Sequence, residues 1–207
     1  MRQVFGVILA GGQALRMGGV DKALLRIGGE PILSLLRARL APQCDGLALN
    51  ANGDPARFAA FGLPIVADGA TGFLGPLAGV LAGLDYASAI ASQACDIVTV
   101  PGDTPFAPAD LVARLRASRD ATGASIAVAA SGDRVHHAVA LWPSELRDDL
   151  RRALVEEDVR KVSAFIARYT HTIVTWPTAP VDPFFNVNRP DDLAVAESCG
   201  SKGRRAQ

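Results

Sequence analysis

Short apolar runs alternate with longer segments of helical period along most of the chain, and this alternation limits the folds open to it. An apolar run of strand length followed by a helical segment is typical of a parallel sheet whose faces are covered by helices. The alternation therefore predicts an α/β fold with a mostly parallel central sheet and helices on both faces. The predicted strands are residues 4–10, 46–50, 64–67, 96–100, 125–129, 138–142 and 171–175.

Proline marks the start of three predicted helices, because its fixed φ angle suits the first helical turn. Pro31, Pro76 and Pro108 each precede apolar residues spaced to form one face of a helix. Later in the chain, Gly132 and Asp133 predict a turn between two strand-like pieces, which adds an antiparallel element to the sheet. Further helices are predicted at residues 143–154, 158–169 and 189–197.

The composition allows one well-packed domain and disfavours nucleic acid as a partner. Of the 207 residues, 49% are hydrophobic, which is enough to bury a sizeable core. We expect a single domain over residues 1–197 and a disordered tail over 198–207, where no apolar period is found. Lys and Arg number 21, as do Asp and Glu, so the chain carries no excess of positive charge to hold a phosphate backbone.

The cysteines and the N-terminal stretch both indicate a cytoplasmic protein. Cys44, Cys95 and Cys199 are widely spaced and form no CxxC pair, so we expect thiols in a reducing compartment. The apolar stretch 4–10 is short for a signal peptide and is interpreted as a buried strand. Charged and polar residues interrupt every longer apolar stretch, so we predict no membrane span.

The segment VILAGGQALRMGGVDKALL, residues 7–25, follows the first predicted strand with paired glycines and then a single lysine. Gly11 and Gly12 allow backbone amides to approach an anion closely, at the strand end where parallel sheets bind ligands. The segment fits neither the P-loop pattern nor the dinucleotide-binding pattern. Bare amides, the Arg16 guanidinium and the Lys22 ammonium on one loop suit a triphosphate. An ordinary glycine turn with surface cations is the alternative.

This segment resembles the N-terminal signature of the nucleotidyltransferases, and of the molybdenum cofactor guanylyltransferases in particular. The resemblance implies a three-layer, Rossmann-like nucleotidyltransferase fold. It also implies transfer of GMP from GTP to the molybdopterin form of the molybdenum cofactor, with release of pyrophosphate and a requirement for Mg²⁺. Motifs that agree in order and spacing are LALNAN (47–52), PIVAD (64–68), GPLAG (75–79), VPGDTPF (100–106) and FFNVNRPDDL (184–193).

The resemblance assigns roles to the residues that match these motifs. Lys22, Arg16 and Asp103 are implied to be catalytic, and Asp103 is also implied to bind the metal. One carboxylate at a strand end is sufficient for Mg²⁺, which usually completes its coordination with phosphates and water. An aspartate that shapes the turn before the next helix is the alternative for Asp103. The implied nucleotide-binding residues are Leu9, Ala10, Gly11, Gly12, Lys22, Asn50, Asp68 and Asp103.

Two pairs of asparagines leave a choice between binding and turn chemistry. Asn50 and Asn52 follow the second predicted strand, where an amide can read a purine or ribose or can tie down a turn. Asn186 and Asn188 alternate and so share a face if the segment is extended. The resemblance implies that this segment helps to form the pterin side of the site, and a loop anchor before the last helix is the alternative.

Four other polar residues receive no firm role. His136 and His137 are followed by Ala138, whereas the family commonly has proline after the histidine, so we expect surface or turn histidines. Arg160 and Lys161 either contact the pterin phosphate or begin a solvated helix.

The implied reaction needs charge neutralisation and alignment rather than a general base, because the attacking phosphate is already ionised near neutral pH. A cytidylyltransferase of the same fold and a non-catalytic GTP-binding adaptor are the alternatives. The cytidylyl relatives typically have alanine at the position of Gly11, and glycine leaves more room for a purine. The resemblance also implies transient contact with an insertion chaperone or an acceptor molybdoenzyme, while the charge balance and the interrupted apolar stretches predict no contact with nucleic acid or membrane.

Overall fold

The computed structural model describes residues 2–11, 21–69 and 75–203 of the chain. Within them, seven strands form one sheet in the order β5-β4-β1-β6-β8-β7-β9, and all neighbours are parallel except where β8 pairs with β6 and β7. The predicted α/β class is therefore confirmed, and each predicted strand is present. The strands are β1 (Val4–Leu9), β4 (Gly46–Asn50), β5 (Ile65–Val66), β6 (Asp96–Pro101), β7 (Ile126–Ser131), β8 (Arg134–Pro143) and β9 (His171–Trp176).

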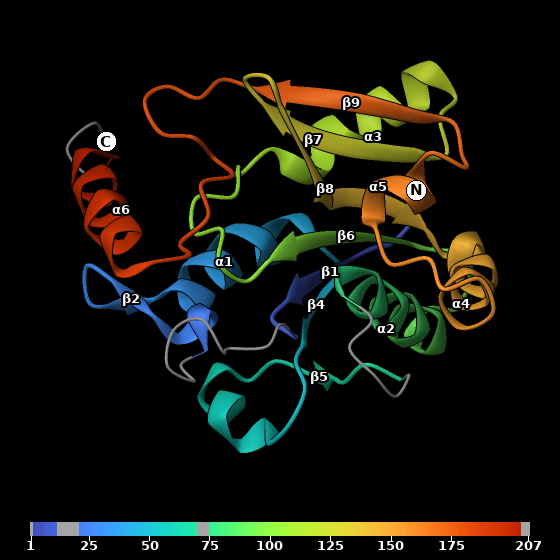
Figure 1. Cartoon of the computed structure of the whole chain (residues 1–207), viewed down its shortest axis with the longest axis horizontal. Coiled ribbons are helices and arrows are strands. Elements are labelled where there is room, and N and C mark those ends of the chain that lie inside the picture. Colours follow the sequence, from blue (N-terminus) through green and yellow to red (C-terminus); the bar gives the residue numbers. More distant parts are fainter. Residues whose placement is uncertain (1, 12–20, 70–74, 204–207) are drawn as a thin grey trace.

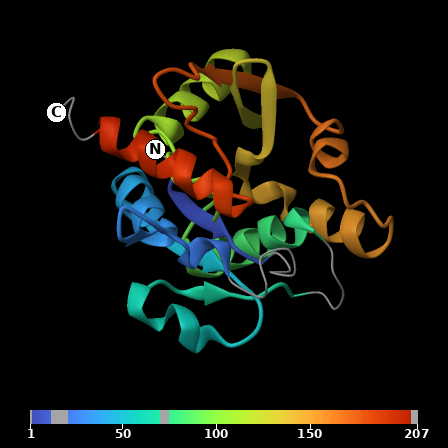
Figure 2. The ribbon, with the colours of Figure 1, turned by 60° about the vertical axis from the view of Figure 1, so that its left-hand side comes forward.

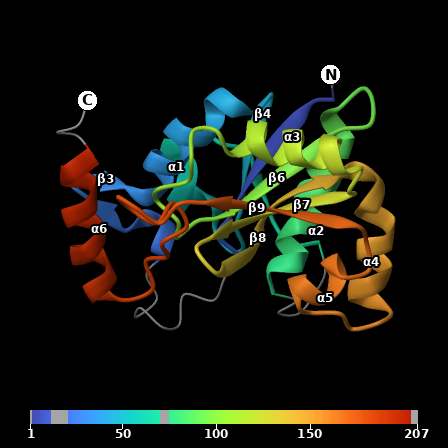
Figure 3. The same ribbon diagram turned by 90° about the horizontal axis from the view of Figure 1, so that it is seen from above.

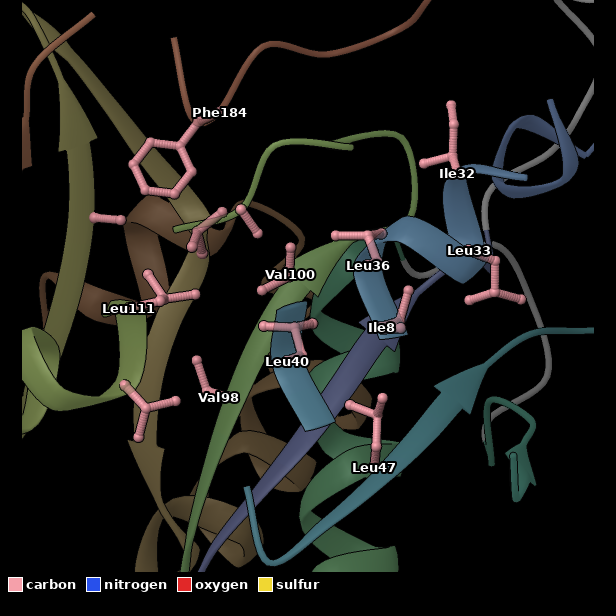
Figure 4. Close-up of a cluster of buried hydrophobic side chains, with 14 of the residues drawn as sticks. Ile8, Ile32, Leu33, Leu36, Leu40, Leu47, Val98, Val100, Leu111 and Phe184 are labelled. Carbon is pink, nitrogen blue, oxygen red and sulfur yellow. The ribbon is translucent and has the colours of Figure 1, made fainter. Parts of the chain in front are cut away.

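Helices cover both faces of this sheet, which gives the three layers seen in Figures 1 and 3. Neighbouring side chains of β6 point to opposite faces, so Val98 joins one apolar core and Ile97 joins the other. The first core includes Leu36 of α1 and Leu111 of α3 (Figure 4), and the second includes Trp142 under α2, α4 and α5. The helices are α1 (Ile32–Leu40), α2 (Pro76–Ile90), α3 (Leu111–Thr122), α4 (Arg147–Val155), α5 (Val162–Ile166) and α6 (Pro190–Gly203).

The predicted turn and antiparallel element are both found, as the hairpin of β7 and β8. Gly132 in the turn has a φ of 52°, a left-handed conformation that glycine adopts without strain. Strand β8 runs antiparallel to β6 with Thr99 opposite Ala140, and it begins earlier than predicted, at Arg134. Its first residues therefore extend past the carboxyl end of β6, where they pair with β7.

Two predicted helices have different bounds in the structure. The helix expected over 158–169 is shortened to α5, because Asp158 has a φ of 55° and cannot belong to a right-handed helix. The helix expected over 189–197 continues as α6 to Gly203, into the segment predicted to be a disordered tail. Residues 190–203 contain no proline after Pro190 to break the helix, and residues 204–207 lie outside the described part of the chain.

Shorter elements connect this framework and were not predicted. Strands β2 (Arg26–Ile27) and β3 (Glu30–Pro31) form a small hairpin around Gly28 and Gly29, which both have positive φ. Helix α6 lies beside β2 (Figure 2). The remaining short elements are the 3-10 segments η2 (Lys22–Leu24), η3 (Ala41–Gln43), η4 (Pro55–Phe61) and η5 (Ser144–Leu146). Among the described residues, no helix has the length and apolar character needed to cross a membrane.

Candidate functional site

The carboxyl ends of four parallel strands lie at one edge of the sheet. In the register, Leu9 at the end of β1 is opposite both Asn50 of β4 and Pro101 of β6, and Asn50 is in turn opposite Val66 of β5. Two backbone bonds continue this alignment into the loops: Ala10 N donates to Asn50 O at 2.8 Å, and Gly102 N donates to Leu9 O at 2.8 Å. The loops that follow these strands therefore start side by side.

Asp68 is held in place by two asparagine side chains. Asn50 Nδ2 donates to Asp68 Oδ1 at 2.9 Å, and Asn52 Nδ2 donates to Asp68 Oδ2 at 2.7 Å. Asn52 also accepts a hydrogen bond from the Asp68 backbone amide at 2.9 Å and approaches the Gly11 carbonyl at 3.4 Å. Both carboxylate oxygens thus have a fixed direction, and each keeps lone pairs for a further donor.

Gly11 lies against this asparagine and aspartate group. A Cβ at Gly11 would lie 3.0 Å from Asn50 Oδ1 and 3.2 Å from Asn52 Nδ2, which is closer than most such contacts. Gly79 in α2 approaches from the other side, since a Cβ there would lie 2.3 Å from Asn50 Oδ1. Glycine at these two positions therefore makes room for the buried Asn50 side chain.

The second half of the site gathers around Asp103, in the loop after β6. Lys22 Nζ lies 3.2 Å from Asp103 Oδ2 and also donates to Asn188 Oδ1. The Asp103 side chain is only 17% exposed. The ammonium group thus contacts a carboxylate and an amide oxygen that come from opposite ends of the chain.

The segment with the second asparagine pair is tied to this loop by two more bonds. Val187 N donates to the Asp103 carbonyl at 2.9 Å, and Thr104 Oγ1 donates to Asn186 Oδ1 at 3.2 Å. The structure therefore brings together Lys22 and Asp103, which were predicted to be catalytic, and Asn186 and Asn188, which were predicted to contact the second substrate. Two more predicted site residues, Gly12 and Arg16, lie outside the described residues.

Asp103 has the chemistry that a divalent cation requires. Mg²⁺ prefers hard oxygen ligands and is commonly held by one or two carboxylates together with the phosphates of a nucleotide. Within the described residues, no group of three or more histidine, cysteine or acidic side chains could hold a metal alone. A partly exposed carboxylate in contact with Lys22 fits a cation that arrives with its nucleotide.

His136 is buried, so the expectation of a surface or turn histidine is wrong for this residue. Its Nε2 is 2.8 Å from Ser131 Oγ, and its ring lies 4.8 Å from the ring of Phe184, centroid to centroid. Burial and the nearby Arg134 lower the pKa of His136, which keeps the imidazole neutral. The hairpin of β7 and β8 was predicted, but the packing of Phe184 against the His136 ring had no signal in the sequence. His136 thereby supports Phe184 at the start of the segment that reaches Asp103.

Arg160 and Lys161 lie in the loop before α5. Within the described residues, no hydrogen bond or ion pair joins either of them to Asp103 or Lys22. Arg160 pairs with Asp158 and donates to the Leu154 carbonyl at 3.2 Å, so its guanidinium bonds within its own part of the chain. Lys161 is exposed at the start of α5. Both positions fit the solvated helix start that was one of the two expectations.

Comparison with known proteins identifies the family. A sequence model of the MobA-like NTP transferase domain matches residues 6–173, which is most of the chain. The chain belongs to the MobA-like NTP transferase family. This confirms the resemblance found in the glycine-rich segment and the later motifs.

Relatives within the MobA-like family match almost the whole chain. The molybdenum cofactor guanylyltransferase of Rhodopseudomonas palustris (strain BisB5) is 57% identical over 199 residues, which cover 96% of this chain and 95% of that protein. The molybdenum cofactor guanylyltransferase of Mesorhizobium japonicum is 54% identical over 200 residues, which cover 94% of this chain and 95% of the relative.

Solved structures share the fold of this MobA-like domain. Molybdopterin-guanine dinucleotide biosynthesis protein A from Archaeoglobus fulgidus superposes with a TM-score of 0.72 at 22% identity, covering 96% of this chain and 99% of that one. A Mycobacterium tuberculosis protein in complex with manganese superposes with a TM-score of 0.66 at 19% identity, covering 95% of this chain and 98% of that one. At these identities the likeness concerns the fold.

Proposed function

We propose that this protein is a molybdenum cofactor guanylyltransferase. It transfers GMP from GTP to the terminal phosphate of molybdenum–molybdopterin and releases pyrophosphate. The observation that carries the proposal is the joining of Lys22, Asp103 and Asn188 at one sheet edge, in a chain 57% identical to a relative of that name.

The guanosine end of GTP is assigned to the Asp68 side of the site. A carboxylate with both oxygens oriented can accept the paired N–H groups of guanine or a ribose hydroxyl. Asn50 and Gly11 border the same carboxylate, and Gly11 has no side chain that would displace Asn50 from it. Asn52 also holds this carboxylate, because its amide already bonds to Asp68 and to the Gly11 carbonyl. It orients Asp68 instead of reading the base.

The triphosphate is assigned to Lys22 and Asp103. Asp103 would hold Mg²⁺, which would neutralise charge on the phosphate oxygens. An ammonium has three donors, and two of those on Lys22 face Asp103 and Asn188, so one remains for a phosphate oxygen. Lys22 thus reduces the repulsion between the two phosphates that must meet. No general base is required for an attacking phosphate that is already ionised.

The pterin substrate is assigned to the segment of Asn186 and Asn188. This segment borders Asp103 through Val187 and borders Lys22 through Asn188, so a phosphate bound there would lie near the α-phosphate of GTP. We also propose a cytoplasmic location, and handover of the product to an insertion chaperone or an acceptor molybdoenzyme.

Pyrophosphate release by the purified protein tests the proposal. The protein is incubated with Mg²⁺, molybdenum-loaded molybdopterin and, in separate reactions, GTP, CTP, ATP or UTP. Release with GTP that requires the pterin is the expected result. Release with CTP instead of GTP would support nucleotidyl transfer but refute guanine as the base of the nucleotide substrate. Binding of GTP without release in any reaction would favour the non-catalytic adaptor.

A further inference from the structure

Arg57 connects the Lys22 side of the site to the Asp68 side, although no hydrogen bond or ion pair within the described residues joins it to either of these two side chains. Its Nη1 lies 3.0 Å from Asp21 Oδ2, and its Nη2 donates to the backbone carbonyl of Asn52. Asp21 directly precedes Lys22, and Asn52 is the residue that orients Asp68. One guanidinium therefore links the segment that carries the phosphate-binding lysine to the loop on the guanosine side.

The local structure fixes the direction from which Arg57 approaches. Arg57 lies in η4, where the Asp54 side chain accepts the Ala56 amide at 2.9 Å as a cap. The neighbouring Phe58 is 1% exposed and anchors η4 in the core, and the Arg57 guanidinium lies 4.9 Å from the centre of its ring. An anchored turn thus presents the guanidinium, so less side-chain entropy is lost when it forms its ion pair.

Asp21 needs a cation because of where it lies. Its side chain is only 13% exposed, and it is next in sequence to a lysine whose partners are Asp103 and Asn188. An unpaired carboxylate there would compete for Lys22 and would repel an incoming triphosphate. Arg57 supplies the positive charge that cancels it.

We propose that Arg57 is a positioning residue for GTP: by pairing with Asp21, it keeps that carboxylate from Lys22 and from the phosphates. The inference rests on the proposed function, since it takes GTP as the nucleotide. The role of Arg57 is separate from base recognition and from metal binding. Without Arg57, the negative charge of Asp21 would weaken GTP binding, and Arg57 neutralises that charge.

The test compares Arg57→Gln, Asp21→Asn and the double variant in steady-state pyrophosphate release, with GTP varied at saturating pterin. Arg151→Gln is the matched control, because Arg151 forms a surface ion pair of 2.6 Å with Asp85 between α4 and α2. We expect Arg57→Gln to raise KM for GTP about tenfold while kcat changes by less than about twofold. Asp21→Asn and the control should keep the wild-type KM. The double variant should return KM to near the wild-type value, because it removes the carboxylate as well as the cation.

Salt and a charge-conserving variant separate this electrostatic role from a structural one. The KM difference between wild type and Arg57→Gln should shrink at about 0.5 M salt, where exposed charges are screened. Arg57→Lys keeps the charge but loses the fork that also reaches Asn52, so it should keep a KM near the wild-type value. A KM for Arg57→Lys as high as that of Arg57→Gln would overturn the proposal.

Two other results would also refute it: a double variant as impaired as Arg57→Gln, or loss of activity in Asp21→Asn. Calorimetric titration with GTP and Mg²⁺ alone gives the same comparison without the pterin. An inactive wild-type protein would therefore refute the proposed function, while the order of GTP affinities among the variants would still decide the role of Arg57.

Discussion

Replacement of Asp103 by asparagine separates a metal-binding role from a turn-shaping role. Asparagine has nearly the same shape, retains an oxygen that can accept from Lys22, and leaves the backbone bond from Val187 to the Asp103 carbonyl unchanged. In this ion pair, the Asp103 side chain is 17% exposed and the Lys22 side chain is 30% exposed. A partly exposed pair of this kind is worth about 1 kcal/mol at most, which corresponds to a shift in Tm of about 2–4 °C for a chain of this size.

The expected effect on turnover is much larger. Loss of one preorganised group that stabilises charge in a transition state typically lowers kcat about 100- to 1000-fold, equal to about 2.7–4 kcal/mol, and we expect a loss of this order. We would measure pyrophosphate release with GTP, Mg²⁺ and molybdenum-loaded molybdopterin, and Tm by calorimetry on the same preparation. The reasoning is refuted if Asp103→Asn keeps its turnover, or if its activity falls only in proportion to its stability.

Three further substitutions test other parts of the site. Lys22→Ala should slow turnover about 100-fold with GTP still bound, as seen by comparing kcat with GTP affinity from calorimetry, and an unchanged kcat would remove Lys22 from the mechanism. Gly11→Ala should lower kcat/KM for GTP about tenfold relative to CTP, because the new Cβ would lie 3.0 Å from Asn50 Oδ1; equal losses with both nucleotides would contradict a role in base choice. The lowered pKa of His136 means that the folded state binds fewer protons than the unfolded state, so its contribution to stability is complete above about pH 6.5 and declines as the pH falls through the lowered folded-state pKa. His136→Gln should therefore weaken the pH dependence of the urea midpoint below about pH 6.5 relative to wild type, and an unchanged pH dependence would assign the acid sensitivity to other groups.

Local patterns were sufficient to predict the framework and half of the site. Apolar runs mark the strands because both faces of the sheet are covered, so even short strands such as β5 appear as continuous hydrophobic segments. The motif residues Asn50, Asp68 and Asp103 follow strands that end at the same edge, and parallel pairing alone brings them together. Their chemical roles came from the resemblance, and the structure supplies the contacts on which those roles can be tested.

Contacts between distant segments could not be predicted in this way. The bond from Lys22 to Asn188 and the ion pair of Arg57 with Asp21 depend on how loops lie over the sheet, and no spacing in the sequence encodes that. The burial of His136 was missed for the same reason, since Phe184 reaches it from a segment far along the chain. The late start of α5 was also missed, because the positive φ of Asp158 is unusual for a residue with a side chain.

The bonds that tie residues 186–188 to Lys22, Asp103 and Thr104 have a consequence for the order in which the protein becomes active. They connect the first strand–loop unit and the middle of the sheet to a segment near the end of the chain, across as many as 166 residues. Contacts between such distant residues form late, since the chain between them must first be ordered. During synthesis, the glycine-rich segment and Asp103 leave the ribosome before the asparagines that complete the site. The newly made chain therefore has its complete candidate site only once almost all of it has been synthesised and folded.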